Sequence, residues 1–115
     1  MNILEELKSI LTELNVPVET GVFSNKAPST YIVLVPIDDT YPLSGDDKPL
    51  IDQNEVRISI YTKGNYIALK NQILDKLLLS DFTITTRRFG GYESGTGYFQ
   101  YTIDVAKIYD IEEEN

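Results

Sequence analysis

The side chains that most often carry enzyme chemistry are scarce in this sequence. It contains no histidine and no cysteine. Ser–His–Asp and Cys–His arrangements and the common zinc sites are therefore excluded. Carboxylates, lysine, tyrosine, serine and threonine remain for acid–base or nucleophilic work, and no active site is visible among them.

The best candidate group of carboxylates lies in residues 38–54, DDTYPLSGDDKPLIDQN. Asp38–Asp39 and Asp46–Asp47 are adjacent pairs. Because neighbours on an extended chain point to opposite sides, neither pair converges as a catalytic pair must. The segment also lacks the spacing of a calcium loop. Loose binding of a divalent cation stays open beside the simpler interpretation, a solvated acidic loop.

Two other motifs give weak signals. The GTG at 95–97 is followed by neither a third glycine nor a helix, so it indicates a hairpin turn rather than a dinucleotide site. Arg87 and Arg88 could clamp an anion, or they could face solvent or bind a neighbour as an ion pair.

The eight tyrosines favour contact surfaces, because tyrosine offers contact area at low entropic cost. Those expected near strand ends, with part of each ring exposed, are Tyr61, Tyr92, Tyr98 and Tyr109.

The acidic residues are unevenly distributed. The formal net charge is −8, and residues 1–20, 38–54 and 110–115 are acidic while the remainder is mildly basic. This asymmetry suits head-to-tail contact between copies, although solubility alone also explains it. Sequence-independent DNA binding is disfavoured, since phosphate contacts need a dense basic surface. The sequence has no long apolar run and no signal-peptide pattern, so we expect a cytoplasmic protein without membrane contact.

The elements that must position these residues follow from periodicity. Asn2 and Asn65 are plausible helix N-caps, and Glu5 completes a capping box with Asn2. Helical spacing and period-two alternation predict helices at 2–14 and 66–79 and strands at 18–23, 30–36, 55–63, 81–89 and 98–109.

These elements predict one α+β domain over 1–109. The order is α-β-β-β-α-β-β, with one mainly antiparallel sheet and two helices packed on one face. The other face should be polar and suited to a partly dry contact, with Arg57, Tyr61, Arg87, Gln100 and Thr102 on it. Residues 38–54 should form a mobile loop that cannot pair as a ladder, ordered only on assembly. Residues 110–115 should be a disordered acidic tail.

This pattern resembles the tail-completion proteins of long-tailed bacteriophages, which include tail terminators and head-to-tail joining proteins. The matching pieces span roughly 20–109. They are GVF, a linker with Pro28, TYIVLVP, then EVRISIYTKGNYIALKNQILDKLL after a variable loop, and TRRFGGYESGTGYFQYTIDVAKIY.

The resemblance implies a structural protein rather than an enzyme, with no catalytic residues, no cofactor and no metal. Subunits of that family form a ring, typically a hexamer, on the last ring of the tail tube and present a docking surface to the head. The implied partners are a second copy, the tail-tube protein and the head–tail connector proteins. The implied location is the virion tail, assembled in the bacterial cytoplasm, with DNA passing through the ring.

The acidic loop would then contact neighbouring rings or line the channel. If it lines the channel, Asp46, Asp47 and Asp52 would repel DNA phosphates. Two alternatives stay open: a head-completion connector, and a non-viral α+β binding module or small enzyme. The candidate interface residues are Tyr41, Asp46, Asp47, Lys48, Asp52, Arg57, Tyr61, Arg87, Arg88, Tyr92 and Tyr98.

Overall fold

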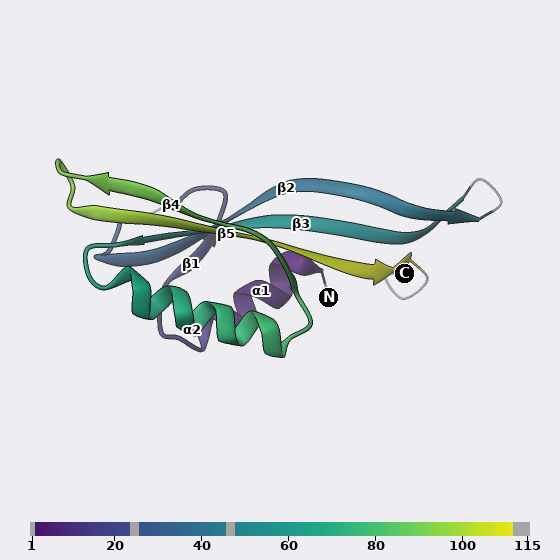
Figure 1. The fold of residues 1–115 in the computed structure, drawn as a ribbon, viewed down its shortest axis with the longest axis horizontal. Helices are drawn as coiled ribbons and strands as arrows, with labels where there is room; N and C mark the ends of the chain where they lie inside the picture. Colours follow the sequence, from purple (N-terminus) through teal and green to yellow (C-terminus); the bar gives the residue numbers. More distant parts are fainter. Residues whose placement is uncertain (1, 24–25, 46–47, 112–115) are drawn as a thin grey trace.

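A computed structural model describes residues 2–23, 26–45 and 48–111. The elements are α1 (Ile3–Thr12), β1 (Val18–Thr20), β2 (Thr30–Gly45), β3 (Lys48–Thr62), α2 (Tyr66–Leu79), β4 (Thr83–Glu93) and β5 (Tyr98–Asp110). The predicted α+β order, α-β-β-β-α-β-β, is confirmed (Figure 1).

Both helices begin at the asparagines that the sequence indicated. Asn2 Oδ1 accepts a hydrogen bond from the Glu5 amide at 2.9 Å. Asn65 Oδ1 accepts from the amides of Ile67 and Ala68. Each cap satisfies backbone donors that the first helical turn leaves without a partner.

The five strands form one mixed sheet in the order β1-β2-β3-β5-β4. β1 is short and runs parallel to β2, while every other neighbouring pair is antiparallel. In Figure 1, β2, β3 and the end of β5 extend well past β4 as a long arm. The arm explains the elongated extents of the described chain, 54 × 26 × 22 Å.

The prediction that residues 38–54 cannot pair as a ladder was wrong. Asp38–Thr40 pair with Gln53–Glu55, and Leu43 pairs with Ile51. Proline is tolerated because this part of β2 is an edge strand, where a missing amide donor costs little. The register breaks beside Pro36 and between Thr40 and Leu43, as expected where the ladder must accommodate proline. Asp110 also pairs, with Ile51, so β5 continues one residue into the predicted tail.

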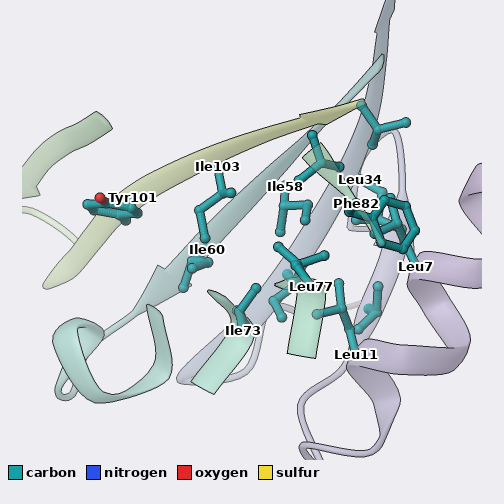
Figure 2. Close-up of a cluster of buried hydrophobic side chains, with 14 of the residues drawn as sticks. Leu7, Leu11, Leu34, Ile58, Ile60, Ile73, Leu77, Phe82, Tyr101 and Ile103 are labelled. Atoms are coloured by element: carbon teal, nitrogen blue, oxygen red, sulfur yellow. The ribbon is translucent and has the colours of Figure 1, made fainter. Parts of the chain in front are cut away.

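The core lies between one face of the sheet and the two helices. Side chains of both helices and alternate side chains of β2, β3 and β5 belong to one buried cluster, part of which Figure 2 shows. Ile58 of β3, Ile73 of α2 and Leu11 of α1 are fully buried within it. Because the strands alternate, the residues between these apolar positions lie on the opposite face of the sheet.

Two irregularities in β4 change which way its side chains point. The register against β5 shifts between Ile84 and Thr86 and again between Phe89 and Gly91. After the first shift Arg87 pairs with Ile103, a core residue, so Arg87 lies on the core side of the sheet. Its predicted place beside Arg57 was therefore wrong, because a bulge inserts one residue and reverses the alternation. The strand also includes residues 90–93, beyond its predicted end at residue 89.

Candidate functional site

The face of the sheet opposite the core is the most distinctive surface of the molecule. We call it the polar face and define it by residues that alternate with core residues along β2, β3 and β5. It consists of Tyr31, Val33, Arg57, Ser59, Tyr61, Tyr98, Gln100, Thr102 and Asp104. The cross-strand pairs Tyr31–Tyr61, Tyr61–Gln100 and Arg57–Asp104 join three strands across this face.

Four aromatic rings gather at one end of the polar face. Tyr31 and Tyr61 stack with their ring centroids 4.8 Å apart. Phe23 lies 4.9 Å from Tyr31, and Tyr98 meets Tyr31 edge-on at 5.6 Å. These distances lie in the range of favourable aromatic pairs, which contribute about 0.5–1.5 kcal/mol each beyond area burial. We call this group the tyrosine cluster.

Hydrogen bonds fix the orientation of the tyrosine cluster. The Tyr98 hydroxyl donates to the backbone carbonyl of Pro28, which ties β5 to the segment that precedes β2. Gln100 Nε2 donates to the Tyr61 hydroxyl at 3.1 Å. The ammonium of Lys63 lies 4.9 Å from the Tyr98 ring centroid, a cation–π distance. The rings are therefore held in place rather than free to rotate on the surface.

Tyr31 at the centre of the cluster is electrostatically perturbed. Burial raises the pKa of its phenol, and the neighbouring Tyr61 and Tyr98 raise it further. Loss of a proton there would create a charge in a partly desolvated site beside other ionisable phenols. The raised pKa keeps the Tyr31 phenol neutral to a higher pH than an ordinary tyrosine.

A hollow of about 360 Å³ lies beside the cluster. Its lining includes Tyr31, Tyr61, Tyr98, Gln100 and the backbone of Gly90. Gly90 lies close to Gln100, because a Cβ at position 90 would lie 3.1 Å from the Gln100 side chain. The second register shift in β4 places Gly91 opposite Gln100 and leaves Gly90 as the extra residue.

The polar face also holds a bidentate ion pair. Arg57 Nε and Nη2 donate to the two carboxylate oxygens of Asp104 at 2.9 and 3.0 Å. The Asp104 side chain is 8% exposed and the Arg57 side chain 45% exposed. The hydrogen bonds to Asp104 raise the pKa of Arg57 above its usual value, and the negative charge of Asp104 raises it as well. The pair fixes the guanidinium against the sheet while leaving part of it open to contact.

The candidate residues of the arm lie apart from the tyrosine cluster. Tyr41 is 63% exposed and occupies the irregular part of the β2–β3 ladder. Lys48 pairs with Gly45 near the tip and is exposed. Asp52 is half-buried and accepts a hydrogen bond from Asn54 Nδ2 at 3.1 Å. Asp46 and Asp47 lie outside the described residues.

The remaining candidates lie on β4. Arg87 and Arg88 are exposed on this edge strand and form no ion pair with another described residue. Tyr92 is 56% exposed and packs against Phe99 on the core side, with ring centroids 4.7 Å apart. Of the nine candidates within the described residues, Tyr61 and Tyr98 meet in the cluster, and Arg57 and Arg88 lie on the same side of the sheet. Tyr92 joins Tyr61 and Tyr98 in lining the hollow.

Sequence reasoning missed Tyr31, Phe23 and the partner of Arg57. Tyr31 was hidden inside the apolar run TYIVLVP, and only the strand register shows that it stacks on Tyr61. Asp104 did carry a signal, since it is an acidic residue between apolar neighbours on the predicted polar face. A charge at such a position is usually paired.

The described residues contain no group of three or more carboxylates, histidines or cysteines arranged to hold a metal ion. None of the helices in this part of the chain is long and apolar enough to cross a membrane.

No protein-family model matches the sequence, and no curated protein matches it. The site combines aromatic rings held by hydrogen bonds, one guanidinium fixed by an ion pair and a projecting arm.

Proposed function

We propose that this chain is a structural bacteriophage or prophage protein that completes the tail. In this proposal copies of the chain form a ring, in its typical form a hexamer, that closes the tail tube and joins the tail to the head. The support is the resemblance in element order together with the shape and surface of the fold.

The observation that carries the proposal is the arm. A free-standing domain gains little from a three-stranded extension that reaches away from its core. The arm nevertheless exposes large apolar side chains, and such groups outside a core mark contact surfaces. They are Ile37, Tyr41, Leu50 and Ile108. A subunit that must touch neighbouring rings has a use for such an extension.

The polar face adds a second surface of the right composition. Tyrosine and arginine are enriched at protein interfaces, and both are held here in fixed orientations. Because the arm and the tyrosine cluster lie at different places on the sheet, one subunit offers two separate contact regions. A ring subunit that lies between a tube and a head needs at least two contact regions.

A null allele of the gene in its own phage or prophage genome tests the proposal. We expect heads and tails to accumulate unjoined, with tails of irregular length in electron micrographs, and infectious yield to be lost. A plasmid copy should restore the yield. A matched copy with Lys76→Gln, which removes only a surface ion pair with Glu13, should restore it equally. Normal joined particles from the null strain would refute the proposal.

The same experiment separates tail completion from the head-side alternative. If the chain acts on the head side, the null strain should form tails of normal length that lack heads. If it acts on the tail, the tube length itself should be unregulated. Affinity capture of purified tail tubes or purified heads by the tagged chain provides an independent readout.

A further inference from the structure

The sheet has two free edges. Among the described residues, β1 pairs with β2 along Ile32–Leu34, and β2 from Val35 onward has a strand neighbour on one side alone. β4 is the outermost strand at the other side and pairs only with β5. Free edges present backbone donors and acceptors that can pair with another strand.

The two edges carry opposite charges. Asp38 and Asp39 are exposed on the β2 edge, and Arg87 and Arg88 are exposed on the β4 edge. None of the four forms an ion pair with another described residue; Asp39 accepts one hydrogen bond, from Asn54 at 2.7 Å. Acidic edge and basic edge are thus complementary surfaces of the same chain.

The charges also match face by face. Asp38 pairs with Glu55 and Arg88 pairs with Thr102, which places both on the polar-face side of the sheet. Asp39 and Arg87 lie on the core side, through their pairs with Asn54 and Ile103. An antiparallel register that sets 38 opposite 88 sets 39 opposite 87, and opposed residues share a face.

Strand direction agrees with that register. β2, β3, β5 and β4 each run antiparallel to the next, so β4 runs opposite to β2. A second copy in the same orientation therefore presents its β2 edge antiparallel to β4. Like-to-like contacts would instead oppose Asp to Asp or Arg to Arg, which is destabilising in a ladder.

We propose that a second copy of this chain adds its β2 edge to the β4 edge of the first, with Asp38 opposite Arg88 and Asp39 opposite Arg87. The contact joins two different surfaces, so repetition closes a ring when the rotation per copy permits. The expectation that the copies close into a ring rests on the proposed function. The edge contact is tested by self-association alone, so the edge contact and the tail-completion function can fail independently.

Charge reversal gives a sharp test. The variant Asp38→Lys/Asp39→Lys has two basic edges, and the variant Arg87→Glu/Arg88→Glu has two acidic edges. In sedimentation velocity, the wild-type chain should associate and each variant alone should sediment as a monomer. An equimolar mixture should associate again in alternating order, and the chain carrying all four substitutions should associate with itself. The control Glu5→Lys/Asp75→Lys makes the same change of charge as Asp38→Lys/Asp39→Lys, at exposed positions of the two helices, and should associate as the wild type does.

The salt dependence of the wild-type chain needs no variant. Its association constant should fall at least about tenfold as the screening length shrinks from about 30 Å at 0.01 M salt to about 3 Å at 1 M. Three results would each overturn the inference: a wild-type chain that stays monomeric, association that is insensitive to salt, or circular-dichroism-verified variants that associate alone as well as in the mixture. The null-allele phenotype is unaffected by any of them.

Discussion

The ion pair on the polar face allows a quantitative prediction. Two charge-assisted hydrogen bonds join Arg57 to Asp104, and in a buried site each would contribute about 1.5–3 kcal/mol. The guanidinium is nearly half exposed, so solvent screening reduces the net coupling. We expect the coupling between the two side chains to be about 1–2 kcal/mol.

The two single substitutions should have unequal effects. Arg57→Leu leaves the Asp104 carboxylate unpaired at 8% exposure, which adds a desolvation penalty of about 1–3 kcal/mol. With the lost coupling included, its total cost should be about 2–5 kcal/mol. Asp104→Asn removes a charge, but the exposed guanidinium can turn into water, so its cost should be about 1 kcal/mol.

Urea unfolding followed by circular dichroism measures these values for the wild type, both single variants and the double variant. The double variant should be less destabilised than the sum of the singles, by the coupling energy. Costs that add to within about 0.5 kcal/mol would mean that the pair has no net coupling and would refute the reasoning. A larger cost for Asp104→Asn than for Arg57→Leu would refute the assignment of Asp104 as the buried partner.

Further predictions concern the core, the cluster and the strand ends. Ile73→Ala should lower the free energy of unfolding by about 2–5 kcal/mol because Ile73 is fully buried, whereas Lys76→Gln should cost less than about 1 kcal/mol; urea midpoints compare the two. Because folding raises the pKa of Tyr31, its neutral phenol contributes stability that is fully present below the ordinary tyrosine pKa of about 10. This contribution is lost as the pH rises through the folded-state pKa. Thermal unfolding against pH should therefore show a smaller alkaline fall in Tyr31→Phe, and an unchanged fall would contradict the placement. Gly91→Ala should cost about 1–3 kcal/mol because φ is +121° there, and thermal melts should show a matching decrease. Amides of 53–55, paired on both sides, should exchange with solvent more slowly than those of the 94–97 turn; equal rates would mean that the arm is not a stable ladder.

Much of the fold could be predicted because its signals are local. Helix caps at Asn2 and Asn65 depend on a few neighbouring residues, and both appear as expected. The alternation of Val56, Ile58 and Ile60 likewise identified the core face of β3. Such patterns need no knowledge of what lies across the sheet.

The arm could not be predicted, because its strands are stabilised by pairing rather than by composition. Aspartate and proline disfavour strands on average, yet an edge strand tolerates both. Thr40 and Gln53 face each other across a ladder whose register includes three breaks. Nothing in 38–54 alone encodes that register. Whether the arm gains order on assembly stays a prediction.

The candidate site was predicted in part for a related reason. Tyr61, Tyr98 and Arg57 were found because exposed strand positions favour contact residues. The stack on Tyr31 and the position of Arg87 depend on cross-strand register, and a single bulge before Arg87 reversed its face. Residue type thus indicated the kind of surface, and only the fold showed which residues share it.

The central claim is that this chain completes a phage tail as a ring between tube and head. Gold labelling of an epitope-tagged chain in purified particles, seen by electron microscopy, tests it most directly. The last paired residue is Asp110, so a tag appended after residue 115 adds nothing within a described strand. We predict gold at one position per particle, at the head-proximal end of the tail. Gold along the tube, on the capsid surface, or absent from particles would contradict the account.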